Sequence, residues 1–342
     1  MRILQIANPS MPIPPKTVGG VERIVHALIV ELQRMGHEIT LMAEDTSQPP
    51  DGVKFHGIGT YWDQGDKLAK VWSHLVRFGG DYDVIHNHGR LIFHLPRIWG
   101  RAAKVHTFHI GELLVPNVKQ FVSLRPRNFS FAPCGNWIGE KFSHLGGRWT
   151  TVNNGIPASL YRPGYEVAAD APLLIVARMA PAKGISAAIS VARKAKRRLL
   201  IAGRVGDQPH EKEWFRDHVE RFCDGEQIKF VGPVTDQDKQ DLIAGAAAVL
   251  LPIQASEAFN VVMIEALACA TPVIGYDLYC IPELVRDGYN GFLARDEDDM
   301  VAKVGRLGEI DRRNCRADFE ARFSAEVMTR RYVDLYRSLG AR

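Results

Sequence analysis

The chain has 342 residues, of which 46% are hydrophobic and 24% charged, with a formal net charge of +4. One hydrophobic core rarely organises so many residues, so two domains of an ordinary soluble enzyme are expected. The five cysteines form no CxxC pair and are odd in number, which argues against a disulfide framework.

The start of the chain, 1–7, is a short strand-like run that lacks the apolar segment of a signal peptide. The longest stretch without a charge, 242–256, contains Pro252 and is too short to span a bilayer. We therefore predict a cytoplasmic protein. Peripheral contact with the inner membrane face stays open, because residues 1–155 hold 17 Lys and Arg against 12 Asp and Glu, whereas the remainder holds 26 against 27. An anionic acceptor or an ordinary solvated face would explain the same excess, and we expect no nucleic-acid partner.

Apolar strand-like runs alternate with helical stretches twice along the chain. In the first half, strands are expected at 2–7, 38–43, 53–58, 83–88 and 104–108, with helices near 20–35 and 65–78. In the second half, strands are expected at 173–177, 199–202, 228–231, 249–253 and 273–276. Both halves therefore predict doubly wound α/β domains, separated near the turn-rich segment 153–157 and followed by a final helical stretch at 323–339 that docks on another surface.

Glu265 is the only charged residue in the run 261–270, which is otherwise almost wholly apolar. A helix that is hydrophobic on every side is buried, and a buried carboxylate needs a binding partner. Glu257 lies eight residues upstream, in the loop that follows the strand expected at 249–253. Because open α/β sheets bind ligands beyond the carboxyl ends of their strands, this arrangement predicts a polar pocket there.

Two cations, Arg178 and Lys183, follow the strand expected at 173–177 and lead into the next helix. Fixed positive charge beside a helix N-terminus suits a diphosphate, although a solvated loop with salt bridges is the alternative. Phe259 and Asn260 precede the amides that open the Glu265 helix. Phosphate at the amides and hydroxyl groups at the carboxylates together describe a nucleotide sugar.

These residues resemble a known family. Glu257 to Glu265 resembles the E-x7-E motif of the retaining glycosyltransferases of family 4, and Arg178 with Lys183-Gly184 is similar to that family's diphosphate-binding pair. The segments 271–274, 281–283 and 19–23 resemble the strand and loop after the E-x7-E helix and the first Gly-rich loop of the family. The ordered motifs span nearly the whole chain.

The resemblance implies the GT-B fold, in which two Rossmann-like doubly wound domains face a cleft. Residues 1–155 would form an acceptor-binding N-terminal domain and residues 156–322 a domain that binds the nucleotide sugar. Residues 323–342 would form a C-terminal helix that crosses back to the first domain.

The resemblance also implies roles for individual residues. Glu257 would bind hydroxyl groups of the donor sugar, Glu265 the ribose, and Arg178 and Lys183 the diphosphate. The donor-binding set is completed by residues whose backbone would approach the nucleotide, with a mere turn as the alternative for the two glycines. These residues are Gly19, Gly20, Val231, Gly232, Phe259, Asn260 and Val261.

Four histidines lie on or just after two strands of the first half: His86, His88, His106 and His109. A zinc site is disfavoured because Glu112 alone lies near ligand spacing, so hydrogen-bonded structural histidines are expected for most of them. The exception is His109, because 107–109 resembles the place of the family's active-site histidine. Two Asp-x-Asp matches, 81–83 and 296–298, are interpreted as a pre-strand turn and a helix cap.

The implied activity is a retaining, metal-independent transfer of a hexose from a UDP-sugar, or next from a GDP-sugar, to an acceptor hydroxyl. No cofactor is expected, because the nucleotide sugar is a substrate. The acceptor, whether small molecule, lipid-linked or glycoside, would contact the loop 111–127.

Two other interpretations stay open: a sugar-nucleotide-binding protein without transferase activity, and an epimerase or phosphorylase on the same fold. A dinucleotide dehydrogenase is disfavoured because no G-x-G-x-x-G follows the first strand. The family's usual residues are replaced at Ala258, Asn260, Val262 and Tyr279-Cys280, which leaves the donor undefined.

Overall fold

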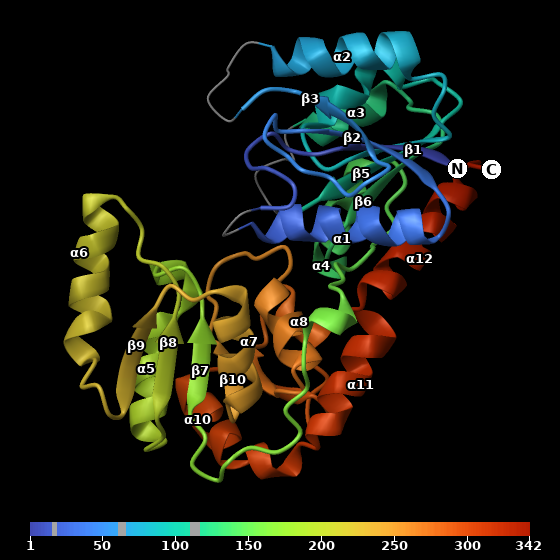
Figure 1. The fold of residues 1–342 in the computed structure, drawn as a ribbon. Helices are drawn as coiled ribbons and strands as arrows, with labels where there is room; N and C mark the ends of the chain where they lie inside the picture. Colours follow the sequence, from blue (N-terminus) through green and yellow to red (C-terminus); the bar gives the residue numbers. More distant parts are fainter. Residues whose placement is uncertain (16–18, 61–65, 110–116) are drawn as a thin grey trace. The chain divides into compact units, whose positions relative to one another are not determined.

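The computed structural model describes residues 1–15, 19–60, 66–109 and 117–342, which form two compact units (Figure 1). Unit 1 comprises Met1–Pro157 and Phe323–Arg342, and unit 2 comprises Ala158–Arg322. The chain therefore passes from one unit to the other two residues beyond the boundary placed at 155, and its last 20 residues return to unit 1.

Unit 1 is built on a six-stranded parallel sheet with the order β3-β2-β1-β4-β5-β6. Its strands are β1 (Arg2–Ile6), β2 (Glu38–Ala43), β3 (Lys54–Gly57), β4 (Val84–Asn87), β5 (Ala103–Phe108) and β6 (Phe129–Pro133). Its helices are α1 (Gly20–Arg34), α2 (Lys67–Phe78), α3 (Val118–Ser123), α4 (Asn136–Phe142) and α12 (Ala325–Ser338), with a 3-10 segment η1 (Leu91–Arg97).

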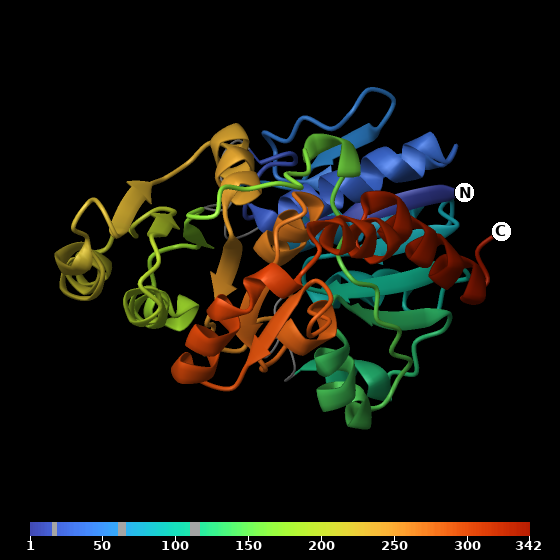
Figure 2. The same ribbon diagram turned by 90° about the horizontal axis from the view of Figure 1, so that it is seen from below.

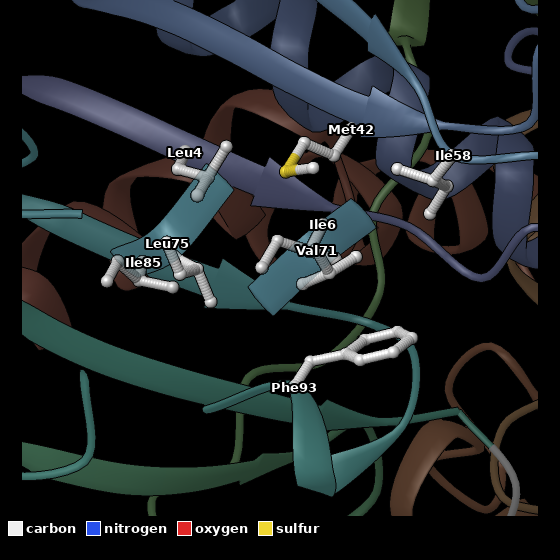
Figure 3. Close-up of a cluster of buried hydrophobic side chains, with 8 residues drawn as sticks. All are labelled: Leu4, Ile6, Met42, Ile58, Val71, Leu75, Ile85 and Phe93. Atoms are coloured by element: carbon white, nitrogen blue, oxygen red, sulfur yellow. The ribbon is translucent and has the colours of Figure 1, made fainter. Parts of the chain in front are cut away.

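The two faces of the first sheet are covered by different helices. Alternate strand residues point to opposite faces, so Leu4 and Ile6 of β1 pack with Val71 and Leu75 of α2 (Figure 3). On the opposite face, α12 lies beside α1 and contacts β5 (Figure 2). The apolar spacing of α2 is therefore explained by core packing.

Unit 2 repeats the design with a six-stranded parallel sheet in the order β12-β11-β10-β7-β8-β9. Its strands are β7 (Leu173–Val176), β8 (Leu199–Ala202), β9 (Ile228–Gly232), β10 (Ala248–Leu251), β11 (Val273–Tyr276) and β12 (Gly291–Ala294). Its helices are α5 (Ile185–Lys194), α6 (Pro209–His218), α7 (Asp236–Gly245), α8 (Val261–Ala268), α9 (Ile281–Leu284), α10 (Glu297–Gly305) and α11 (Arg312–Arg322).

Both sheets have the same topology. Numbered from its own first strand, each sheet runs 3-2-1-4-5-6, the order of the Rossmann fold, so the predicted pair of doubly wound domains is confirmed. The order in which strands are added to the sheet reverses between the first and fourth strands, which are the parallel neighbours β1 and β4 in unit 1 and β7 and β10 in unit 2. Ligands of such sheets bind at this switch point, beyond the carboxyl ends of the strands.

The sequence prediction missed one edge strand in each sheet. β6 contains Pro133 and β12 has only four residues, so neither carries a long apolar run. Edge strands need only one hydrogen-bonded neighbour, which tolerates short and Pro-containing sequences.

The C-terminal helix docks on unit 1 through polar as well as apolar contacts. Ser324 caps α12 by accepting a hydrogen bond from the Val327 backbone N–H. The buried Tyr332 and Tyr336 hydroxyls meet Thr107 of β5 and His86 of β4 at 2.9 and 2.7 Å. The return of the last helix to the first domain, predicted from the sequence, is thus fixed by hydrogen bonds to the sheet.

Candidate active site

In unit 2, an ion pair joins the segments that follow the two strands at the switch point. The Lys183 ammonium, after β7, donates to both carboxylate oxygens of Glu257, after β10, at 2.8 and 2.7 Å. The two side chains are only 28% and 21% exposed, so water screens them less than a surface pair. The sequence placed both residues in one site but did not predict that they pair.

Gly184 explains why the two segments approach so closely. Its φ is +70°, and a Cβ atom there would lie 1.9 Å from the Pro252 carbonyl oxygen. Only glycine combines this left-handed conformation with that contact. Gly184 therefore brings Lys183 against the chain that leads to Glu257.

Arg178 lies apart from this pair. Its guanidinium Nη1 is 3.3 Å from the Glu211 carboxylate at the start of α6, and its side chain is 60% exposed. A pair so exposed contributes little to stability, so the guanidinium is available for another anion. Glu211 also closes the capping box of α6 with Gln208, and no sequence pattern indicated its contact with Arg178.

The N-terminus of α8 follows Glu257 directly. The Asn260 side chain caps this helix by accepting a hydrogen bond from the Met263 backbone N–H at 3.1 Å. Phe259 and Asn260 are buried, while Val261 is the first helical residue. The backbone N–H groups of a first helical turn point outward along the axis and favour an anion.

Glu265 lies in the second turn of α8 and is almost completely buried. One oxygen, Oε1, accepts hydrogen bonds from the Lys239 ammonium at 2.6 Å and the Tyr161 hydroxyl at 2.9 Å. The other oxygen, Oε2, is buried without a hydrogen-bond partner among the described residues. The sequence required a partner for this carboxylate, and the structure supplies Lys239 and Tyr161, which sequence reasoning did not identify.

Neighbouring groups hold these two partners in place. Gln240 of α7 accepts from the Arg162 backbone N–H at 2.9 Å and donates to the Leu160 carbonyl at 2.6 Å, so it clamps the segment around Tyr161. Burial, followed by the charge of Glu265, raises the pKa of Tyr161 well above its usual range. The phenol is therefore a hydrogen-bond donor to Glu265 throughout the physiological pH range.

Val231 and Gly232 end β9, where the Val231 side chain is exposed and Gly232 has a φ of +87°.

In unit 1, Gly19 has a φ of +144°, and a Cβ atom there would lie 2.7 Å from Pro15 Cβ, so a larger residue is disfavoured. Gly20 is the first residue of α1. Gly19 thus needs its freedom for local packing, and its approach to a phosphate stays a prediction.

In unit 1, His109 follows β5 and meets His88, which follows β4. His88 Nδ1 lies 3.0 Å from His109 Nε2, and His88 Nε2 lies 2.8 Å from the Oε1 atom of Gln5 on β1. His86 bridges Tyr336 and Thr107 through its two ring nitrogens. The expectation of hydrogen-bonded structural histidines therefore holds for His86 and His88.

Within the described part of the chain, His106 is an exception to this expectation. Both ring nitrogens of His106, and of His94 beside it, are buried without a hydrogen-bond partner among the described residues. Burial lowers the pKa of His106 to about 3 and that of His109 to about 4. These imidazoles are therefore neutral near pH 7 and do not supply positive charge.

The Asp-x-Asp interpretations are confirmed: Asp83 precedes β4 and accepts from the Arg2 backbone N–H, while Asp296 caps α10. Among the described residues, no three His, Cys, Asp or Glu side chains are grouped as metal ligands.

Burial and then the charge of Glu257 raise the pKa of Cys280 to about 12, so this departure from the family pattern adds no thiolate. The first part of the predicted acceptor loop, 111–116, lies outside the described residues.

Two domains of Rossmann topology are the architecture of the GT-B glycosyltransferases, and an acid before and an acid inside the helix after the fourth strand of the second domain agree with that class. Family models agree with this class in both halves of the chain: Glycosyltransferase Family 4 matches residues 18–156 and Glycosyl transferases group 1 matches residues 167–321. The chain belongs to this family, as the sequence resemblance implied.

Curated relatives and solved structures are consistent with that assignment. The chain is 29% identical to the phosphatidyl-myo-inositol mannosyltransferase of Mycolicibacterium smegmatis, over 96% of this chain and 89% of that protein. It is also 29% identical to D-inositol 3-phosphate glycosyltransferase 2 of Catenulispora acidiphila, over 56% and 50% of the two chains. The structure of Anabaena HepE with UDP shares the fold at a TM-score of 0.77 and 18% identity, covering 99% and 100%. No helix in the described part of the chain is long and apolar enough to cross a bilayer.

Proposed function

We propose that this glycosyltransferase moves a hexose from a nucleotide sugar, with retention of anomeric configuration, and that unit 2 binds the donor. The observation that carries the proposal is the buried Oε2 atom of Glu265, a carboxylate oxygen without a partner among the described residues. Such an oxygen is costly unless a hydroxyl group binds it. Lys239 and Tyr161 hold the other oxygen and so fix the direction of the free one.

The diphosphate of the donor would bind to Lys183, Arg178 and the first turn of α8. Lys183 is already within 2.8 Å of Glu257, and a dianionic diphosphate would compete for its ammonium and draw Arg178 from its weak contact with Glu211. The released Glu257 carboxylate could then accept hydrogen bonds from sugar hydroxyls. Without donor, Lys183 and Glu257 pair with each other. With donor bound, the phosphate would pair with Lys183 and the sugar hydroxyls with Glu257.

The chemistry is a single exchange at the anomeric carbon. Its bond to the diphosphate oxygen breaks, a bond to the acceptor oxygen forms on the same face, and the acceptor proton passes to the leaving diphosphate. Negative charge grows on that leaving group, so Lys183, Arg178 and the α8 amides stabilise the transition state more than the ground state. No metal is required in this scheme. His109 of unit 1, neutral because burial lowers its pKa to about 4, would orient the sugar and the acceptor.

The donor proposed first is a UDP-sugar and next a GDP-sugar. UDP and UDP-glucose complexes of the structural neighbour HepE support the first choice. Two relatives are named for transfer to inositol phosphate or phosphatidyl-inositol, so an inositol-bearing acceptor is the first acceptor class to test. A lipid-linked acceptor would require peripheral contact with the membrane.

The test is slow hydrolysis of a panel of UDP-, GDP-, ADP- and dTDP-sugars without acceptor, followed by the same panel with inositol phosphate. Glu265→Ala and Arg178→Ala serve as loss-of-function variants. Glu309→Ala serves as the matched control, because Glu309 belongs to an exposed ion pair in the turn that follows α10. We expect turnover of one donor, lost in the first two variants only, with the product anomer matching the donor by NMR. Nucleotide binding without turnover of any donor, with or without acceptor, would instead indicate a binding protein.

A further inference from the structure

A chain of hydrogen bonds leads from the sheet of unit 1 to His109. Gln5 lies on β1 and is completely buried, and its Oε1 atom is 2.8 Å from His88 Nε2. The other ring nitrogen of His88 is 3.0 Å from His109 Nε2. The last nitrogen of the chain, His109 Nδ1, is buried and has no hydrogen-bond partner among the described residues.

The chemistry of Gln5 decides the direction of the protons along this chain. An amide oxygen only accepts, so His88 Nε2 carries a hydrogen and donates it to Gln5. The second nitrogen of a neutral imidazole is then an acceptor, so His109 Nε2 carries a hydrogen and donates it to His88 Nδ1. His109 Nδ1 is left with a lone pair and no hydrogen.

The surroundings keep the chain neutral. Other histidines, His86 and His106, face His88 and His109, and burial with these neighbours lowers the pKa of His88 well below its usual value. The Gln5 amide nitrogen is buried and has no hydrogen-bond partner among the described residues. Gln5 nevertheless lies near the Tyr336 hydroxyl and lowers the pKa of Tyr336, although burial has the larger effect and raises it. An NH2 group directed at that hydroxyl agrees with Oε1 directed at His88.

We infer that Gln5 and His88 are positioning residues that hold His109 as its Nε2–H tautomer, so that His109 Nδ1 accepts a hydrogen bond from a hydroxyl group of the substrate. The use of that acceptor in catalysis rests on the proposed transfer of a sugar, whereas the tautomer itself does not. The site selects a hydroxyl donor and disfavours a substrate with a hydrogen or fluorine at the same position. An imidazole in the other tautomer would present N–H, which donates to a hydroxyl oxygen and does not accept from a hydroxyl hydrogen.

The direct test is the ring-nitrogen NMR spectrum of the full-length chain labelled with 15N-histidine, assigned with His88→Asn and His109→Asn variants. For the unsubstituted protein we expect a pyridine-type Nδ1 and a pyrrole-type Nε2 in His109 near pH 7. The reverse pattern, or a mixture of tautomers, would overturn the proposal without any appeal to activity.

Gln5→Leu removes the acceptor but keeps a side chain of similar size. Because His88 Nε2 then has no acceptor, we expect His109 to lose its single tautomer and its signals to shift toward the average of both forms. Tyr332→Phe is the matched control: it removes the partner of the Thr107 hydroxyl from the same buried network and touches no hydrogen bond of the Gln5–His88–His109 chain. An equal change in both variants would indicate general loosening and contradict the proposal.

Kinetics give the second measurement, once a donor is known. We expect Gln5→Leu to lower kcat about 5- to 100-fold, since a mismatched hydrogen bond replaces a matched one, while UDP or GDP binding is unchanged. His88→Asn, whose amide oxygen can replace the acceptor at Nδ1, should recover part of the activity that His88→Phe loses. If Gln5→Leu alters the tautomer of His109 but keeps a normal kcat, the catalytic use of the acceptor is refuted. If the unsubstituted chain turns over no donor, the proposed function is refuted, and the result on the tautomer still stands.

Discussion

The two units place different chemistry at the same point of the same fold. In unit 1, Gln5 of the first strand meets His88 after the fourth strand through a neutral hydrogen bond of 2.8 Å. In unit 2, Lys183 after the first strand meets Glu257 after the fourth strand through an ion pair at 2.7 Å. The topology thus fixes where the contact forms, and the side chains decide whether that contact selects a tautomer or binds a charge.

The difference extends to the interiors. Ten of the 12 histidines belong to unit 1, whereas the two of unit 2, His210 and His218, are exposed on α6. Unit 2 instead buries Glu265 with Lys239. An enzyme with a charged leaving group needs fixed charge at the site that binds this group. Neutral hydrogen-bonding groups suffice at the site that orients uncharged hydroxyls.

The largest effect is expected from Glu265→Ala. It removes the carboxylate whose Oε2 atom has no partner among the described residues, and it leaves the partly buried Lys239 without its closest acid, which should cost about 3–5 kcal/mol of stability. We expect kcat/KM to fall about 100- to 1000-fold, which is the size of losing one preorganised polar contact in a transition state. Steady-state kinetics with urea unfolding on the same sample check both values. Glu309→Ala should change neither, and a fully active Glu265→Ala would break the comparison, because the buried charge of unit 2 would then be structural.

The next effect concerns acid and unit 1. Burial holds the pKa of His106 at about 3 and of His109 at about 4, below the ordinary 6.5. Between these values the unfolded chain binds protons that the folded chain does not, so stability is present above about pH 6.5 and is lost as pH falls toward 4. Each excluded proton gives a slope of about 1.4 kcal/mol per pH unit.

Fluorescence can assign this acid loss to one unit, because five of the six tryptophans lie in unit 1. In a Trp214→Phe background, urea unfolding from pH 8 to pH 4.5 should show unit 1 weakening steadily. His94→Phe should reduce the slope, since it removes one buried imidazole without deleting any hydrogen bond of the described residues. An unchanged slope in that variant would mean that other groups cause the acid loss.

Gly184→Ala tests the packing that joins Lys183 to Glu257. The left-handed φ and the carbonyl of Pro252 at 1.9 Å from the added methyl group should destabilise unit 2 by about 2–4 kcal/mol. The control is Gly225→Ala, which has a φ of +81° but nothing within 4 Å of the added methyl group, and should cost only about 1 kcal/mol. Hydrogen exchange of unit 2 peptides in a urea series measures both, and equal losses would show that conformation, not close approach, requires glycine.

Tyr161→Phe should have the smallest effect. It removes one of two hydrogen bonds to the same Glu265 oxygen, so nucleotide binding should weaken by about 1 kcal/mol. Tyr165→Phe, at an exposed tyrosine of the same segment, is the control and should leave binding unchanged. Calorimetry with UDP or GDP would detect the difference, and a much larger loss would make Tyr161 a direct ligand.

The architecture could be predicted from the sequence because short continuous apolar runs, and the turn residues that separate them, are local signals. The edge strands β6 and β12 escaped, since short strands with one neighbour need little apolar pattern. The buried Glu265 could be identified from composition alone. Its partners Lys239 and Tyr161 could not, because they lie 26 and 104 residues away and only the fold brings them to it.

The histidines show the same limit. Their positions after two neighbouring strands predicted a cluster, and His88 and His109 do meet. Within the described residues His106 and His94 have no hydrogen-bond partner, because aromatic side chains pack around them, and no local pattern encodes that packing.

Calorimetric titration of UDP and GDP into the unsubstituted chain, Lys183→Met and Gln5→Leu would show whether the two units divide the chemistry in this way. If unit 2 binds the nucleotide diphosphate through its ion pair and unit 1 orients hydroxyl groups through a neutral chain, one nucleotide binds, Lys183→Met weakens it at least about tenfold, and Gln5→Leu leaves it unchanged. Equal weakening in the two variants, or binding that survives Lys183→Met intact, would contradict the division of chemistry between the units.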